Sequence, residues 1–337
     1  MNRRTTIKDI ARVLSLSIST VSRALSDHPD ISPLTKKRVA EAASQLGYRA
    51  NLLARGFRQQ HSGIVALILP EVNDYFSPSL IAGLSASLRQ SGRMLQIFLT
   101  QDRAELEAEA VQQCVDLQVE GVLLSLASAT TGLDHLNPLI QNEVPCILID
   151  KTAEDAELHS VRFDGYQAGY QAVRYLVAKG HREIVAVLGS CAWRLTQERE
   201  AGFRSGVAQF AGSQATPNVI HVEQVGELEL LLAKQFSRTE ARPSALFAMS
   251  DELLAHSMRY LQRMGLRIPE DVSVLGVSDG KFPMVSVPSI SYVKTSGYDM
   301  GWLAGLMVSR VRAQEGGTEH VSMPVEIVEQ ESVALRA

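Results

Sequence analysis

The 337-residue sequence predicts a small all-α headpiece followed by a larger α/β body made of two lobes. Two short helix-like segments joined by a tight turn occupy residues 5–25, and from residue 62 onward apolar strand-like runs alternate with helices. The charges divide at the same place. Residues 1–61 contain 11 Lys and Arg against 4 Asp and Glu, whereas the remainder contains 22 against 33. We therefore expect a basic headpiece on an acidic body.

Capping residues define three helices in the headpiece. Thr6 and Ser17 are suitable N-caps for the first two, because their hydroxyl groups can accept a hydrogen bond from a free backbone N–H. Ser32 and Pro33 have the pattern that opens a third helix, and Gly47 is a natural stop. The spacing of the apolar residues predicts one shared core, formed by Ile7, Ile10, Ala11, Leu14, Ile18, Val21, Leu25, Val39, Ala42, Ala43 and Leu46.

The first two helices form a helix-turn-helix, whose second helix can lie in the major groove of DNA. The excess of basic residues in the headpiece is the charge pattern expected for phosphate contact. A helical bundle that binds no DNA would have the same apolar pattern, and this is the alternative interpretation. The motif and the charge together favour DNA binding.

Parallel sheets with helices on both faces are predicted for the body, because strands alternate with helices of 10–15 residues. The strand-like runs are residues 64–70, 94–100, 121–126, 146–150, 160–164, 184–189, 219–225, 245–250 and 272–278. The helical stretches include residues 78–91, 104–118, 166–180, 197–211, 226–237 and 251–265. Nine strands are too many for one small sheet, so we expect two lobes. We place the crossovers between them near residues 161–163 and 288–293.

The sequence has none of the patterns typical of an enzyme, a metal site or a membrane protein. The eight histidines are dispersed, and no HExxH, GxSxG, Walker A or post-strand GxGxxG motif is present. Cys114, Cys146 and Cys191 are widely spaced and fit a reducing compartment. The N-terminal residues have no apolar core of a signal peptide, and no apolar run is long enough to span a membrane. We expect a cytoplasmic non-enzyme without cofactor, catalytic residue or metal.

Residues 6–25 fit the pattern TxxDIAxxxxxSxxTVSRxL through Thr6, Asp9, Ile10, Ala11, Ser17, Thr20, Val21, Ser22, Arg23 and Leu25. This pattern resembles the N-terminus of the lac-repressor (LacI/GalR) family of bacterial transcription regulators. In the body, GHREI at 180–184, RxxGF at 199–203 and PEDV at 269–272 match landmarks of the same family. The resemblance spans essentially residues 5–333, and it implies a body that looks like the sugar-binding proteins of the bacterial periplasm.

The resemblance also implies a function and a domain plan. The function is that of a transcription regulator, most naturally a repressor, which binds near-palindromic double-stranded operator DNA as a homodimer and responds to a sugar or related metabolite bound between the lobes. The alternatives are control by a nucleobase or nucleoside, a phosphorylated metabolite or a protein corepressor, and an activator in place of a repressor. No leucine heptads follow Val333, so a tetramer built by a C-terminal coiled coil is not expected.

The predicted domains are residues 1–49 for the headpiece, 50–61 for a hinge helix and linker, and 62–337 for the effector-binding and dimerisation body. Within the body, the first lobe is expected at about 62–161 and 291–323, and the second at about 162–290 and 324–337.

The residues that the resemblance places on DNA come from the headpiece and the hinge. In the headpiece Ile18, Ser19 and Arg23 occupy outward recognition positions, and Arg23 is the expected guanine reader. The hinge, YRANLLARGF at 48–57, resembles a family helix that enters the minor groove. It has Phe57 where the family has leucine; Phe57 could be inserted between base steps or pack on the body. The full set is Thr6, Ser17, Ile18, Ser19, Thr20, Ser22, Arg23, Asn51, Ala54, Arg55 and Phe57.

Effector-binding residues are expected at the carboxyl ends of the strands, where open α/β sheets bind ligands. The predicted set is Asn73, Tyr75, Phe76, Ser125, Asp150, Asp164, Trp193, Arg199, Ser250, Asp251 and Ser278. Tyr75 and Phe76 resemble the family's ring-stacking residues, although either could simply shield the core, and Trp193 is an alternative stacking surface. Ser278 stands where the family usually has an aspartate that grips sugar hydroxyls, which argues against assigning a particular hexose.

Overall fold

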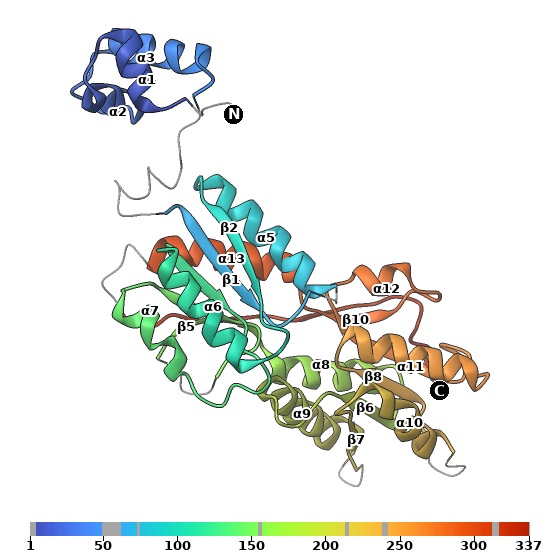
Figure 1. The fold of residues 1–337 in the computed structure, drawn as a ribbon. Helices are drawn as coiled ribbons and strands as arrows, with labels where there is room; N and C mark the ends of the chain where they lie inside the picture. Colours follow the sequence, from blue (N-terminus) through green and yellow to red (C-terminus); the bar gives the residue numbers. More distant parts are fainter. Residues whose placement is uncertain are drawn as a thin grey trace. The chain divides into compact units, whose positions relative to one another are not determined.

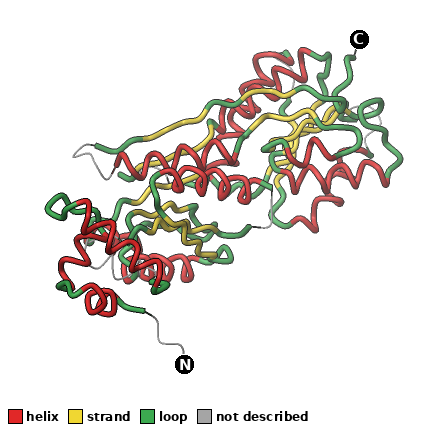
Figure 2. The backbone as a smooth tube through the Cα atoms, turned by 90° about the horizontal axis from the view of Figure 1, so that it is seen from above, coloured by secondary structure: helices red, strands yellow, loops and turns green. Residues whose placement is uncertain are grey.

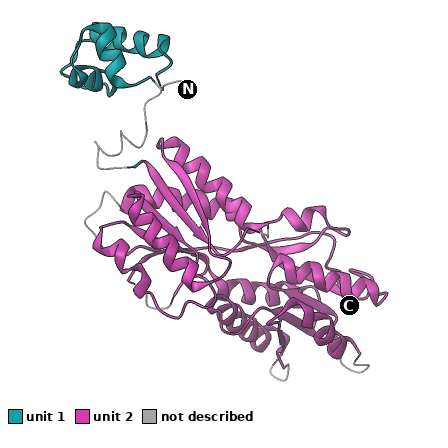
Figure 3. Cartoon of the chain, in the orientation of Figure 1, with its two compact units in different colours: residues 1–62 teal, residues 63–337 magenta. Residues whose placement is uncertain are grey.

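The computed structural model describes residues 5–48, 62–72, 75–153, 157–212, 216–237, 242–311 and 317–336. The chain divides into two compact units, residues 1–62 and residues 63–337 (Figure 3). Each unit is described by itself below.

The first unit is a bundle of three helices, α1 (Ile7–Leu14), α2 (Ile18–Leu25) and α3 (Pro33–Gln45) (Figure 1). The predicted caps of the second and third helices are confirmed. Ser17 Oγ accepts a hydrogen bond from the Thr20 N–H at 3.0 Å, and Ser32 Oγ accepts one from Thr35 N–H at 3.2 Å. The buried core contains Ile10, Ala11, Val21, Ala24, Val39, Ala42 and Ala43.

The first lobe of the body is built on a parallel sheet with strand order β11-β5-β4-β3-β1-β2. The strands are β1 (Ile64–Leu69), β2 (Met94–Leu99), β3 (Gly121–Leu124), β4 (Cys146–Ile149), β5 (His159–Phe163) and β11 (His320–Met323). Helices α5 (Phe76–Gln90) and α13 (Gly297–Val311) pack on one face, and α6 (Ala104–Asp116) and α7 (Asn137–Gln141) pack on the other. Side chains alternate along β1, so that Leu67 packs with one helix pair and Ile68 with the other.

The second lobe repeats this architecture with strand order β12-β10-β9-β8-β6-β7. The strands are β6 (Ile184–Leu188), β7 (Asn218–His221), β8 (Ala245–Ala248), β9 (Ser273–Ser278), β10 (Ser291–Lys294) and β12 (Glu326–Val328). Only the β10–β12 pairing is antiparallel among these described strands. The helices are α8 (Gly165–Ala178), α9 (Arg194–Gly206, continued by a π-helical turn at Val207–Ala211), α10 (Leu228–Phe236), α11 (Asp251–Arg263) and α12 (Lys281–Val285).

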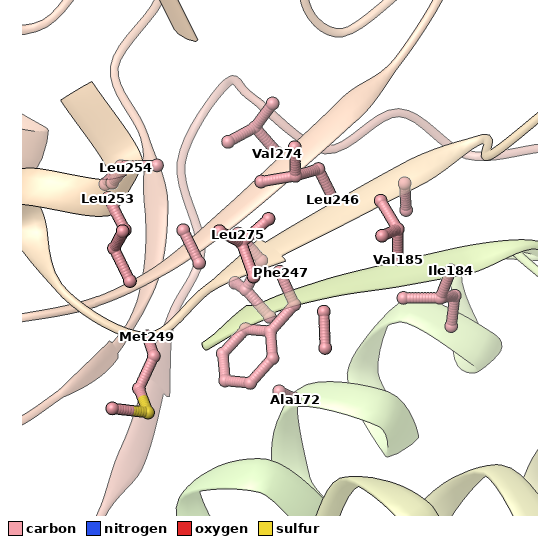
Figure 4. Packing of buried hydrophobic residues seen from close by; sticks show 14 of the residues in the cluster. Ala172, Ile184, Val185, Leu246, Phe247, Met249, Leu253, Leu254, Val274 and Leu275 are labelled. Carbon is pink, nitrogen blue, oxygen red and sulfur yellow. The ribbon is translucent and has the colours of Figure 1, made fainter. Parts of the chain in front are cut away.

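Helices cover the strands in both lobes (Figure 2). In the second lobe, Phe247 of β8 and Leu275 of β9 are buried together with Ala172 of α8 (Figure 4). Helices α8 and α9 approach so closely that a Cβ on Gly202 would lie 1.9 Å from the Tyr166 carbonyl oxygen, which is why only glycine fits there.

All nine predicted strand runs contain a strand, and the predicted two-lobed α/β class is confirmed. Sequence reasoning missed β10, β11 and β12, together with α13. It also placed residues 291–294 in the first lobe, whereas they form β10, which pairs in parallel with β9 of the second lobe. The chain therefore crosses to the first lobe after Lys294, and it crosses back between β11 and β12. In the described residues, no helix combines the length and apolarity needed to cross a membrane.

Candidate functional site

The second helix of the headpiece presents a polar, exposed face. Val21 and Ala24 of α2 point into the three-helix core, whereas Ile18, Ser19 and Arg23 are exposed. Ile18 is 47% exposed although it is large and apolar, so it is available for contact with another molecule.

The other predicted headpiece residues support that face. The Ser17 hydroxyl, besides capping α2, shares hydrogen bonds with the hydroxyls of Ser19 and Thr20 at 2.7 and 2.8 Å. Thr20 and Ser22 are half-buried, and exposed Thr6 donates its hydroxyl to Asp9 at 2.6 Å. The predicted hinge residues Asn51, Ala54, Arg55 and Phe57 lie outside the described residues.

A cavity of about 760 Å³ lies between the two lobes of the body. Its first-lobe wall is formed by residues that follow β1, β3 and β4, such as Glu71, Ser125 and Asp150. The second-lobe wall comes from the start of α9 and from the carboxyl ends of β8 and β9. The cavity has the position and size of small-molecule sites in α/β proteins.

Eight of the eleven predicted effector residues line this cavity, namely Phe76, Ser125, Asp150, Trp193, Arg199, Ser250, Asp251 and Ser278. Asn73 lies outside the described residues.

The two remaining predictions, Tyr75 and Asp164, lie outside the cavity lining. Asp164 caps α8, because its carboxylate accepts the Gln167 N–H at 2.9 Å. Tyr75 is 42% exposed, and its ring stacks on Phe282 of α12 at a centroid distance of 5.9 Å. A residue that follows a strand therefore does not always line the cavity. Its side chain can instead cap a nearby helix, as Asp164 does, or stack on a nearby ring, as Tyr75 does.

Arg199 is the most deeply buried charged group in the described lining. It is 7% exposed, and its Nη1 donates to the Met249 carbonyl at 2.8 Å, while Nε has no hydrogen-bond partner within the described part of the chain. Burial lowers its pKa to about 10, against the opposing effect of the Asp150 and Glu198 carboxylates. The guanidinium is therefore charged at neutral pH and keeps one buried N–H donor unpaired among the described residues.

Sequence reasoning missed several lining residues, including Lys151 and Asp102. Lys151 Nζ lies 4.6 Å from the ring centroid of Trp193, so a first-lobe cation covers the face of a second-lobe aromatic ring. Lys151 therefore occupies one face of the ring that was predicted as a stacking surface. Lys151 follows Asp150 directly, so examining the neighbours of each strand-end residue would have found it.

A buried carboxylate on α6 accepts hydrogen bonds from the loop that follows β3 and lines the cavity. Glu107 is fully buried and accepts hydrogen bonds from Ala127 N–H at 2.6 Å and the Thr130 hydroxyl at 2.9 Å. His135 Nε2 lies 2.9 Å from the same carboxylate. Since Ala127 and Thr130 line the cavity, Glu107 fixes the shape of that wall without being part of it. Nothing in its helical sequence context distinguishes Glu107 from a solvent-exposed glutamate.

Comparison with known proteins identifies two segments of the chain. Residues 6–51 match the family described as "Bacterial regulatory proteins, lacI family", and residues 173–333 match the "Periplasmic binding protein-like domain". The headpiece is thus a lacI-family domain, and the chain is similar to transcriptional regulators over nearly its whole length. It is therefore a transcriptional regulator with an effector-binding domain, and not an enzyme.

Relatives match this chain over most of its length. It is 24% identical over 311 residues to Catabolite control protein A of Priestia megaterium, covering 92% of this chain and 93% of that one. It is 29% identical over 303 residues to the transcriptional regulator AscG of Escherichia coli K12, covering 86% and 87%.

Solved structures confirm the fold of this chain. The lac repressor dimer bound to operator and the anti-inducer ONPF matches with a TM-score of 0.86 at 19% identity, covering 98% of this chain and 100% of that one. The transcriptional regulator CelR in complex with cellobiose matches with a TM-score of 0.70 at 23% identity, again covering 98% and 100%.

Proposed function

We propose that this regulator represses transcription by binding a near-palindromic operator as a homodimer, and that a small molecule in the inter-lobe cavity controls its DNA affinity. The observation that carries the proposal is that one chain combines an exposed α2 face bearing Ile18, Ser19 and Arg23 with a 760 Å³ cavity containing a buried cation. A ligand controls DNA binding only if it binds one lobe arrangement better than another.

The DNA-contacting residues in this proposal are Thr6, Ser17, Ile18, Ser19, Thr20, Ser22 and Arg23, with Asn51, Ala54, Arg55 and Phe57 added from the hinge. Two headpieces would read two half-sites, since two-fold dimers match two-fold DNA sites. Three exposed apolar side chains in and after α12 support self-association, namely Met284, Val285 and Val287, which are 71%, 73% and 84% exposed. The lac repressor structure with the same fold is a dimer. We place the regulator in the cytoplasm, where its DNA target would be.

The effector that the cavity favours is a neutral, hydroxyl-rich metabolite such as a sugar. Among the described lining residues, six are acidic (Glu71, Asp102, Asp150, Asp251, Glu252, Asp279) and three are basic (Lys151, Arg194, Arg199). Carboxylates accept hydrogen bonds from hydroxyl groups and repel anions. The buried, charged guanidinium of Arg199 in the cavity lining favours a metabolite with an acidic group as the second candidate.

Two measurements test the proposal. Selection of duplexes from a random-sequence pool should recover a near-palindrome that the full chain binds at nanomolar concentration. Sugars, nucleosides and sugar phosphates should then be screened for an increase in the unfolding temperature and a change in affinity for that duplex. Failure to enrich any duplex would contradict operator binding. Enrichment without any response to the three compound classes would favour control by a protein corepressor.

A further inference from the structure

The chain enters the body at Gly63, the first residue of the second unit, and both backbone polar groups of Gly63 are held there. Its N–H donates to Glu120 Oε1 at 3.1 Å, and its carbonyl accepts the Met94 N–H at 2.8 Å. Gly63 has φ +71°, a conformation that favours glycine. The segment leading from the headpiece therefore joins the body at a fixed point.

Glu120 connects Gly63 to Arg93, and Arg93 in turn contacts Ser309. Arg93 donates Nε to Glu120 Oε2 at 2.7 Å and Nη1 to Ser309 Oγ at 2.8 Å. The Glu120 side chain is only 9% exposed, so solvent screens the pair weakly. Both carboxylate oxygens of Glu120 are thus used, one for Gly63 and one for Arg93.

Ser309 lies near the end of α13, whose other end is at the cavity. The helix starts at Gly297, two residues after the cavity-lining Thr295, and its 15 residues span about 22 Å. Helix α5 starts at Phe76, which also lines the cavity, and ends at Gln90, three residues before Arg93.

The two helices are packed backbone to backbone. A Cβ on Gly83 of α5 would lie 1.9 Å from the Tyr298 carbonyl oxygen, and one on Gly301 of α13 would lie 2.1 Å from the Leu80 carbonyl oxygen. Figure 1 shows α5 and α13 in the same lobe. Helices packed so closely transmit a displacement with little local relaxation.

We propose that Arg93 and Glu120 are positioning residues for DNA binding, which tie the linker entry at Gly63 to the cavity through α13. This inference rests on the proposed function. Two headpieces that must reach two half-sites together bind best when their attachment points are fixed, because a loose attachment must be ordered on binding. A shift of α13 at the cavity end would move the same attachment point.

The first test measures hydrogen exchange in the full-length protein. The Gly63 amide should be protected in the wild type and exchange about fivefold faster in Glu120→Gln, since a neutral acceptor binds an N–H less strongly than a carboxylate. The matched control is Glu229→Gln, which removes a similar arginine pair, Arg263–Glu229, from the surface of the second lobe. An unprotected Gly63 amide in the wild type, or equal exchange in the two variants, would overturn the inference.

The second test uses the duplex selected by the wild-type chain. Glu120→Gln and Arg93→Met should each weaken binding about fivefold or more, while Glu229→Gln binds as the wild type does and all unfolding temperatures stay within a few degrees. If neither Glu120→Gln nor Arg93→Met binds the duplex more weakly than the wild type does, Arg93 and Glu120 have no positioning role. If the wild type selects no duplex, the proposed function is wrong, and so is the positioning role that rests on it. The exchange experiment still tests the hydrogen bond between Gly63 and Glu120 in that case.

Discussion

Arg162 on β5 of the first lobe places its Nη1 atom 2.8 and 2.7 Å from the two carboxylate oxygens of Glu198 on α9 of the second lobe. Arg194 donates Nε to the same carboxylate at 2.8 Å and Nη1 to the first-lobe Ala153 carbonyl at 3.4 Å. Because Arg194 and Ala153 line the cavity, this bridge joins the lobes directly beside it. The bridge stabilises the arrangement of lobes seen in this structure.

Removing the charge of Glu198 should loosen the lobes. Glu198→Gln should destabilise the bridged arrangement by about 1 kcal/mol, because the pair is only partly shielded from solvent. Small-angle scattering of the ligand-free full chain should show a larger radius of gyration.

The matched control is Glu200→Gln on the same helix, since Glu200 pairs with Arg204 and His221 inside the second lobe. Equal radii of gyration for Glu198→Gln and the wild type would show that the bridge does not hold the lobes together.

Arg199→Met should abolish the response to effector and leave DNA binding intact. Methionine retains much of the buried apolar volume but supplies no donor, so the cavity loses its buried cation. The change in DNA affinity on adding the compound recovered by the screen is the measurement. Arg204→Met is the control, because Arg204 is on the same helix and outside the described lining. A normal response in Arg199→Met would remove Arg199 from the effector site.

Arg23→Ala should cost about 1–3 kcal/mol per half-site and relax the preference at one base pair, because an arginine can bind guanine O6 and N7 together. Arg12→Ala is the comparison: Arg12 is an exposed residue of α1 and pairs with Asp9. Binding should be measured on the selected duplex and on its single-base variants. Uniform weakening on every sequence would make Arg23 a phosphate contact.

The stability of the second lobe should fall as the pH drops below about 6.5. His181 Nδ1 lies 3.0 Å from Ser244 Oγ and Nε2 lies 3.2 Å from the Ala334 carbonyl oxygen. Burial lowers the pKa of His181 below its usual 6.5, so between that value and the lowered pKa the unfolded chain binds more protons than the folded one. Stability is therefore complete above 6.5 and is lost as the pH falls through the folded pKa.

Urea unfolding at pH 7.5 and 5.5 measures this effect, and His181→Gln should reduce the difference between the two values. The variant is needed because burial also lowers the pKa of His159 in the first lobe, which acts in the same direction. An unchanged pH dependence in His181→Gln would assign the whole effect to other groups.

Local patterns were sufficient to predict most of the helices and strands. Ser17 and Ser32 cap helices because a hydroxyl at that position satisfies a free N–H whatever the rest of the fold does. Most of the nine strand runs were recognisable because strands buried on both faces are continuously apolar. The edge strand β2 is partly exposed, but its sequence MLQIFL is still largely apolar. Strands β11 and β12, also at sheet edges, were not predicted because their short sequences HVSM and EIV mix polar with apolar residues.

The sequence by itself therefore determined the helix-turn-helix headpiece, the two-lobed α/β class and most of the strand-end residues at the cavity. Only the tertiary structure decided what each of those side chains does. It stacks Tyr75 on Phe282, places Lys151 over Trp193, and pairs Arg162 with Glu198. These contacts join residues from different elements, and their geometry depends on how two sheets and their helices pack, which no local pattern of residues encodes.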